Sequence, residues 1–386
     1  RTILMRRLKK KIEGFVPARL SGVASNKLVL VLSSLIFITI VNAQTPVLDE
    51  ATEYFLDSPD TGKYAVIMVG PTVGEVNQTR FRQWAFSLHD ILARDYGYTS
   101  DSITLLYDKG KTESLGDERI DGACDREGIE GELSALASRA NTGDQITIYL
   151  IGHGSGAEEE AKFNIVGPDI TGSEFAGMLG LFNDQDIVIV NTTSASYGFS
   201  TSLSGEGRVV ISSTRSPSER YDPIFSRYFI EALDNRNGDR DKNNRVSMLE
   251  AFEYAKSNVE AWYEEQGRLA SEHAGLDDNG DALFSLNPVV DTADGRLAEI
   301  AYIDSAVDEV SGLNSQAREL KFHMQELERD IFILRGRKQD FLEPDYWQEM
   351  ESLLVELAIA TGQFEKVIRD SNDQFETNLT NGQTNE

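Results

Sequence analysis

Hydrophobic runs that alternate with amphipathic stretches determine the fold class of this chain. Five runs have the length and apolar content of strands buried on both faces, and they lie at 64–70, 102–107, 145–151, 186–190 and 207–213. The segments between them, such as 80–96 and 174–181, carry apolar residues at helical spacing. This alternation predicts an α/β fold, a three-layer α/β/α sandwich whose mainly parallel sheet is covered by helices on both faces.

Two of these runs end in polar side chains that can take part in chemistry. His153 and Gly154 follow the run at 145–151, and Thr193 and Ser194 follow the run at 186–190. Open parallel sheets place their sites at the carboxyl ends of the strands, so we expect these four residues to form one site. The first strand end supplies a histidine, whereas the second supplies only hydroxyl groups.

The length and charge of the chain limit its function. With 386 residues and 40% hydrophobic content, it can bury a full α/β core and still hold a second module. Residues 1–43 carry eight basic residues and one acidic residue, a net charge of +7. Since the whole chain carries −27, the remainder carries −34. An acidic body of this kind repels nucleic acid, and we expect no nucleic-acid partner.

The N-terminal segment has the features of an export signal. A basic stretch precedes an apolar run at 28–41, and Ala43 ends a small-residue cleavage motif. We therefore predict a signal peptide over 1–43, a linker over 44–61, and a periplasmic or extracellular location. The alternative is an uncleaved, N-terminally membrane-anchored protein. The single cysteine, Cys124, excludes an internal disulfide.

The C-terminal part has a different periodicity. Apolar residues recur at alternating spacings of four and three over 313–334 and again over 347–368, with Gly336 and Pro344 between the two stretches. This predicts an antiparallel helical hairpin, a coiled coil within 291–370, through which the chain can self-associate. The alternative is that both helices pack on the sheet domain. The polar segment 371–386 is predicted to be disordered.

Four short motifs occupy 81–85, 152–156, 208–214 and 272–281. Their order over residues 62–290 resembles the caspase-like cysteine peptidases, and the legumain-type branch, peptidase family C13, most of all. The resemblance implies a caspase-like fold for 62–290. It also implies that His153 is the catalytic histidine, that the Gly154 N–H belongs to the oxyanion site, and that Thr193 occupies the position of the nucleophilic cysteine.

The threonine at position 193 changes the expected chemistry. A cysteine thiol is partly ionised near neutral pH, but a threonine hydroxyl needs a base in hydrogen-bond contact and a group that orients this base. The legumain branch carries an acidic residue two positions before its cysteine, whereas this chain has Asn191 there. These departures from the family pattern give a site without the thiol and put asparagine-type substrate selectivity in doubt.

Three functional interpretations follow. The first is an inactive pseudopeptidase, a pseudoenzyme that binds a peptide or protein partner. The second is an active hydrolase that uses Thr193 or Ser194 with His153, and the third is substitution of the missing nucleophile by Cys124. The structural alternative is that the hydroxyls at 192–194 cap the following helix and that His153 is hydrogen-bonded in a tight turn.

A separate loop has the spacing of a helix–loop–helix calcium site. Oxygen ligands occur at loop positions one, three, five, seven, nine and twelve, which are Asp239, Asp241, Asn243, the carbonyl of Arg245, Ser247 and Glu250. Asn244 stands where glycine is usual, and asparagine tolerates the left-handed conformation required there. This spacing predicts a structural Ca²⁺ ion. The alternative is an ordinary capping box formed by Ser247 and Glu250.

Overall fold

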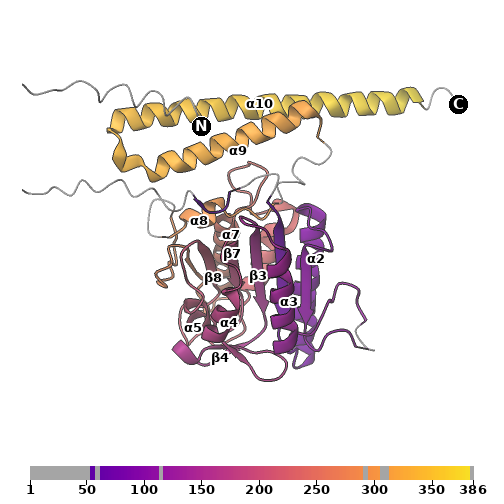
Figure 1. Ribbon diagram of the computed structural model, residues 1–386, viewed down its shortest axis with the longest axis vertical. Coiled ribbons are helices and arrows are strands. Elements are labelled where there is room, and N and C mark those ends of the chain that lie inside the picture. The colour runs from indigo at the N-terminus through magenta and orange to yellow at the C-terminus, as the bar shows by residue number, and fades with distance from the viewer. Residues whose placement is uncertain (1–52, 57–60, 113–115, 290–293, 305–312, 383–386) are drawn as a thin grey trace, which may run out of the picture. The chain divides into compact units, whose positions relative to one another are not determined.

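The computed structural model describes residues 53–56, 61–112, 116–289, 294–304 and 313–382 (Figure 1). The expected signal segment, 1–43, lies outside these residues. All described residues belong to one unit, Leu48–Glu386. Among them, no helix combines the length and the apolar content needed to cross a lipid bilayer.

A six-stranded sheet forms the centre of the α/β domain, in the strand order β2-β1-β3-β7-β8-β9. The first five strands in this order are parallel, and β9 runs antiparallel to β8. The prediction of a mainly parallel sheet is therefore confirmed. The strands are β1 (Lys63–Val69), β2 (Ile103–Tyr107), β3 (Gln145–Ile151), β7 (Asp186–Asn191), β8 (Arg208–Ser212) and β9 (Gly275–Asp277).

Helices cover both faces of this sheet, because the strands present apolar side chains on both sides. In β1, Ala65, Ile67 and Val69 join one hydrophobic cluster, and Val66 and Met68 join the other. The first face is covered by α2 (Glu75–Asp95), α6 (Phe225–Leu233), α7 (Met248–Glu265) and α8 (Arg296–Ile300). The second face is covered by α3 (Arg126–Arg139), α4 (Gly172–Leu179) and α5 (Ser196–Thr201), as Figure 1 shows.

Small elements complete the domain. The short strands β4 (Gly154–Ser155), β5 (Lys162–Phe163) and β6 (Ile170–Thr171) form a second, three-stranded sheet just after His153. Among the described residues of the domain, η2 (Glu158–Glu160) and η3 (Asp234–Arg236) are 3-10 turns, and a further one, η5 (Lys338–Asp340), lies after the domain.

The α/β domain is larger than its predicted range of 62–290. Phe55, in the predicted linker, is 5% exposed, and its N–H donates to Asp186 Oδ2 at 2.6 Å. After the predicted boundary, Leu297 of α8 joins the hydrophobic core, and Ile303 N–H donates to the carbonyl of Val246. The sequence boundaries followed composition, whereas these residues join the domain through long-range packing.

Two helices follow the α/β domain, α9 (Ser315–Gly336) and α10 (Glu343–Gly382). They share two hydrophobic clusters. One joins Met324 and Leu327 to Ala360, and the other joins Leu334 to Met350. The backbone of α10 stays helical beyond residue 371, where a disordered tail was predicted, because extending an existing helix avoids the cost of nucleation.

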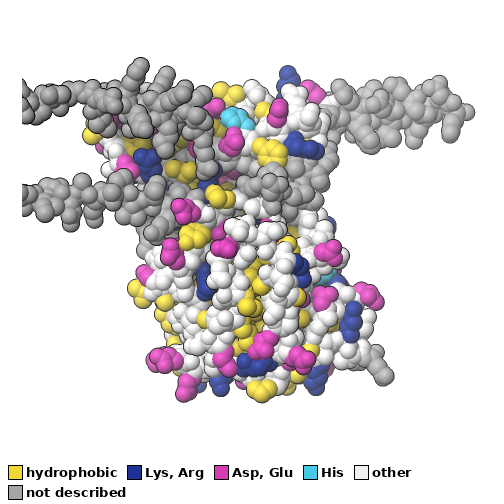
Figure 2. Space-filling view, viewed as in Figure 1, with side chains coloured by type: hydrophobic (Ala, Val, Ile, Leu, Met, Phe, Trp, Pro, Cys, Tyr) yellow, Lys and Arg dark blue, Asp and Glu magenta, His cyan; other side chains and the backbone are white. Residues whose placement is uncertain are grey.

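Charged side chains of both signs lie on the face of the molecule drawn in Figure 2. On the face drawn in Figure 2, Asp and Glu side chains are spread over the α/β domain, with Lys and Arg side chains between them. The large net negative charge of the chain is therefore not gathered into one acidic patch on this face.

Candidate functional site

The predicted strand ends lie next to each other. Strands β3 and β7 are parallel neighbours, and Leu150 pairs with Asn191 at their carboxyl ends. Gly152 then takes φ 143°, and a Cβ there would lie 3.3 Å from the backbone nitrogen of Gly70. This turn brings His153 out at the edge of the sheet, beside the segment that follows β7.

His153 is held by two polar side chains. Its Nδ1 lies 3.0 Å from Asp222 Oδ1, and its Nε2 lies 3.3 Å from the amide nitrogen of Asn77 in α2. The imidazole ring also packs edge-on against Phe81, with ring centroids 5.2 Å apart. The side chain is still 28% exposed, so it combines a fixed orientation with access to solvent.

Asp222 and Asn77 are the members of this group that the sequence did not reveal. The hydrogen bond from His153 keeps the pKa of Asp222 below its ordinary value, and the charge of Arg80 adds to the effect. The residue lies in the loop after β8, which neighbours β7 in the sheet. An acidic residue after the next parallel strand was the only sequence signal for it, and that signal is weak.

Thr193 points away from the histidine in its hydrogen bonding. Its hydroxyl donates to Asn191 Oδ1 at 2.8 Å, and its N–H donates to the same oxygen at 3.1 Å. The side chain is 1% exposed, and within the described part of the chain no hydrogen bond joins it to His153. The hydroxyl proton of Thr193, which a base would have to remove, is therefore hydrogen-bonded to Asn191.

Gly154 and Ser194 contact one another directly. The Gly154 N–H donates to Ser194 Oγ at 3.3 Å, and a Cβ at position 154 would lie 2.3 Å from the carbonyl oxygen of Ser194. Only glycine fits this approach. The N–H that the resemblance assigns to the oxyanion site is thus occupied by a hydroxyl group of the same chain.

The helix-capping alternative for residues 192–194 is wrong. Helix α5 begins after Ala195, which has φ 49° and makes no side-chain cap. A hydroxyl that accepts an N–H of the first turn, that of Tyr197, belongs to Thr214 at 3.1 Å. The Thr192 hydroxyl donates instead to the carbonyl of Leu150 at 2.8 Å. The Thr192 hydroxyl therefore links the segment after β7 to β3 and does not cap α5.

Cys124 lies outside this site. It is fully buried beside Asp125, which caps the start of α3, and burial raises the pKa of its thiol far above the ordinary value. A buried thiol that stays protonated is a poor nucleophile. The cysteine has no contact with His153 among the described interactions.

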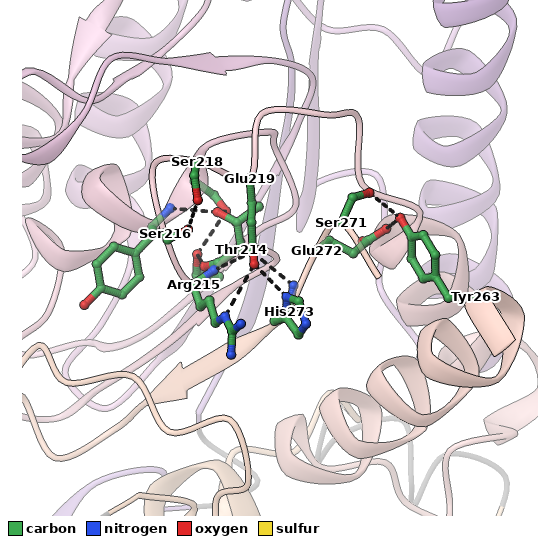
Figure 3. Close-up of polar contacts among 12 residues, drawn as sticks. Thr214, Arg215, Ser216, Ser218, Glu219, Tyr263, Ser271, Glu272 and His273 are labelled. Carbon is green, nitrogen blue, oxygen red and sulfur yellow. Dashed lines mark hydrogen bonds and ion pairs between the residues drawn. The ribbon is translucent and has the colours of Figure 1, made fainter. Parts of the chain in front are cut away.

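A second histidine–carboxylate pair lies in the same loop system, as Figure 3 shows. Glu219 Oε1 is 2.6 Å from His273 Nδ1, and Glu219 Oε2 accepts hydrogen bonds from the backbone N–H groups of Arg215 and His273. The Glu219 carbonyl accepts the N–H of Ala195 at 3.0 Å. One loop, 214–222, therefore supports both His153, through Asp222, and the turn after Thr193.

Glu272, also shown in Figure 3, is a buried carboxylate beside this pair. It is 3% exposed and accepts hydrogen bonds from the N–H groups of Ile224 and Phe225 and from the Tyr263 hydroxyl. Burial raises its pKa to about 7, although these hydrogen bonds oppose the shift. Glu272 fixes the start of α6 to the end of α7.

The predicted calcium loop gathers three carboxylates. Oxygens of Asp239, Asp241 and Glu250 lie within 4.8 Å of one another. Asn244 has φ 65°, the left-handed conformation that the turn requires. The capping box between Ser247 and Glu250 is also present, so Glu250 both starts α7 and faces the loop.

The remaining predicted ligands adopt distinct roles in the loop. Asn243 Oδ1 accepts the N–H of Arg245 at 2.8 Å, and Ser247 Oγ accepts the N–H of Glu250 at 3.2 Å. Removal of water around the Asp241 carboxylate and the negative charges of Glu250 and Asp239 raise the Asp241 pKa to about 6. Mutual repulsion of this kind is what a divalent cation relieves.

Arg245, at loop position seven, also joins the loop to α9. Its side chain is 2% exposed, and its guanidinium lies 3.5 Å from the centre of the Tyr302 ring. A guanidinium nitrogen is 3.6 Å from the carboxylate of Glu328 in α9. The sequence identified only the backbone carbonyl of Arg245, because the partners of its side chain are distant in the chain.

Comparisons with known proteins give little further information. No protein-family model matches this chain, and no curated protein matches it. A crystal structure of a Geobacter sulfurreducens protein, solved as a structural genomics target, is similar to it with a TM-score of 0.36 and 11% identity. The match covers 56% of this chain and 92% of that chain. The function is therefore inferred from the geometry described above.

Proposed function

We propose that this chain is a caspase- and legumain-like domain whose peptidase site is inactive and binds a peptide or protein partner. The observation that carries the proposal is the hydrogen bond from the Thr193 hydroxyl to Asn191 Oδ1, 2.8 Å long in a fully buried position. A nucleophilic hydroxyl must donate its proton to a base in the reaction. This hydroxyl donates to an amide oxygen that cannot accept the proton.

The groups that remain suit binding. His153 and Asp222 are each more than a quarter exposed, and they present a ring, a carboxylate and the neighbouring Asn77 amide at one sheet edge. Polar groups fixed at the carboxyl ends of parallel strands form ligand sites in open α/β sheets. A peptide backbone offers the N–H and C=O groups that complement them.

The purified full chain is expected to cleave no fluorogenic peptide above the buffer rate, and His153→Ala and Thr193→Ala are expected to leave this result unchanged. Thr193→Cys is the second test, because a thiol needs less help from a base than a hydroxyl does, and restored cleavage would show that the groove is intact. Turnover by the natural chain that both alanine variants abolish, and that Cys124→Ala leaves intact, would contradict the proposal.

Binding is tested separately. In a pull-down from a library of fluorescein-labelled peptides, His153→Ala is expected to reduce the retained fluorescence, because it removes the exposed ring between Asn77 and Asp222. His323→Ala is the matched control, since His323 is an exposed histidine on α9. Equal retention by the natural chain and both variants would place binding elsewhere.

One observation favours an active hydrolase as the second candidate. The 3.0 Å contact between His153 Nδ1 and Asp222 is the contact that orients a catalytic imidazole, and Nε2 would act as base once the Asn77 amide, 3.3 Å away, moves aside. In that case Thr193 or Ser194 must first release its present hydrogen bond to reach Nε2. The cleavage assay above distinguishes the two candidates.

We also propose that the loop 239–250 binds Ca²⁺ as a structural ion. The three carboxylates within 4.8 Å and the left-handed Asn244 fit the requirements of a hard cation with oxygen ligands. Asp239, Asp241 and Glu250 would hold the ion with Asn243, the Arg245 carbonyl and Ser247. The ion would neutralise the repulsion between the carboxylates and fix the start of α7.

Addition of 1 mM Ca²⁺ is expected to raise the melting temperature, and EDTA to lower it, because an ion that binds only the folded chain stabilises it. At a concentration about a hundred times the Kd, the gain is about 2.7 kcal/mol. Glu250→Gln is expected to abolish the shift, whereas Glu253→Gln, one turn further along α7, is expected to retain it. A melting temperature indifferent to both calcium and chelator would exclude the ion.

We further propose that α9 and α10 form an antiparallel hairpin, a coiled coil through which the chain self-associates. The two shared clusters support this, because Leu334 contacts the early part of α10 and Met324 a later part. An exported location, with cleavage near Ala43, remains our proposal for the N-terminal segment.

A further inference from the structure

Helix α10 carries a second apolar surface besides the one that contacts α9. The inner surface is formed by Met350, Leu353, Leu357 and Ala360. The outer surface, here called the outer stripe, consists of exposed apolar or small residues, namely Trp347, Val355, Ala358, Ile359 and Gly362. A surface helix of a globular protein normally has one apolar side facing the core, and among the described residues none of the hydrophobic clusters includes a member of the outer stripe.

The large side chains of the outer stripe are strongly exposed. Val355 is 53% exposed and Ile359 is 56% exposed. Small residues lie between them, since Ala358 and Gly362 occupy the same side of the helix, and a Cβ at Gly362 would meet no other atom within 4 Å. Large and small residues at spacings of three and four are the pattern of a helix-packing surface.

Charged side chains lie beside the outer stripe at both of its ends, and the end near residue 370 carries Glu365 and Asp370 as well as basic residues. Glu351 lies toward the start of α10, and Lys366 and Arg369 lie toward residue 370, all exposed on the same side. A parallel pair of such helices would place Glu351 against Glu351. An antiparallel pair places Glu351 of each helix beside Lys366 of the other.

We infer that the outer stripe of α10 pairs with the same stripe of a second copy of this chain, antiparallel, about a two-fold axis between Ala358 and Ile359. In this register Val355 packs over Gly362 of the partner subunit, and Glu351 pairs with Lys366 of the partner subunit. Glu365, the acidic residue beside Lys366, faces Ser352 of the partner subunit. The contact is isologous, as expected for a homodimer.

The inference deepens the proposed self-association and rests on the helical hairpin, not on the peptidase-like site. The cleavage assay is insensitive to the oligomeric state, so the two proposals fail separately. Sedimentation velocity of the full chain measures the dimer directly.

The full chain is expected to sediment as a dimer at about 10 µM, and Ile359→Glu is expected to raise the dimer Kd at least about tenfold by burying two carboxylates near the axis. Leu269→Glu is the matched control, because Leu269 is 95% exposed outside α10. Far-UV circular dichroism verifies that each variant keeps its helices. A monomeric natural chain, or a dimer unaffected by Ile359→Glu, overturns the inference.

Charge exchange tests the register. Glu351→Lys and Lys366→Glu are each expected to weaken the dimer, and the double variant is expected to restore it. Oxidation is expected to cross-link Ile359→Cys, near the axis, but not Trp347→Cys, because the two copies of residue 347 would lie about 35 Å apart along the helix. The natural cysteine does not interfere, since Cys124 is fully buried. Cross-linking through position 347 would show a parallel pair and overturn the inference.

Discussion

Replacement of Arg245 by alanine is expected to lower the free energy of unfolding by about 3 to 5 kcal/mol, as is usual when one partner of a buried ion pair is removed. The guanidinium is packed 3.5 Å from the centre of the Tyr302 ring, and its removal opens a cavity there. It also leaves the Glu328 carboxylate, 19% exposed, without the positive charge 3.6 Å away. Chemical denaturation measures the loss.

Arg240→Ala is the matched control for this variant. Arg240 belongs to the same loop and pairs with Glu253 at 2.8 Å, but its side chain is 78% exposed. The loss there is expected to stay below about 1 kcal/mol, since water screens an exposed pair. Glu328→Gln combined with Arg245→Met is expected to be less damaging than Arg245→Ala, because neither partner leaves an uncompensated charge. Equal losses for Arg245→Ala and Arg240→Ala would refute the buried role.

The free energy of unfolding is expected to rise as the pH falls from 8 to 5, and Glu272 is expected to supply much of the increase. Its pKa is about 7 in the folded chain against about 4.5 ordinarily, so the folded state binds a proton that the unfolded state releases between these values. The stabilisation is complete below pH 4.5 and is lost as the pH rises through 7. A shift of this size corresponds to about 3 kcal/mol.

Glu272→Gln is expected to remove this part of the pH dependence, since glutamine does not titrate. Asp278 and Asp294 act in the same direction, because burial raises their pKa values to about 6 and about 7. The pH profile of the Glu272→Gln variant should therefore be flatter than that of the natural chain without becoming level. Urea titrations at pH 5, 6, 7 and 8 provide the comparison. Identical slopes for the two proteins would assign the pH dependence to other groups.

The sheet was predictable because its strands carry their own signal. Runs such as that at 187–190 are apolar on both faces, and only a sheet covered on both sides buries such runs completely. Strand β9 carries no such signal, because it is three residues long and ends at Asp277. Its place is fixed by pairing with β8 and by the Ser204 hydroxyl and the Ala282 N–H that reach Asp277.

The candidate site was predictable only in its local part. The positions of His153 and Thr193 follow from the strand ends, which sequence periodicity identifies. Asp222 and Glu219, the carboxylates that hold the two histidines, lie in a loop whose course depends on the whole sheet. The direction of the Thr193 hydroxyl was also beyond prediction, since it depends on the rotamer of Asn191.

The length of α10 has a mechanical consequence. With 40 residues it measures about 60 Å, whereas α9, with 22 residues, measures about 33 Å. The part of α10 that exceeds the length of α9 would be marginal in water as an isolated helix. It therefore stays a straight helix only while the part of α10 that packs on α9 remains folded. Loss of the contacts between α9 and α10 would therefore shorten helix α10.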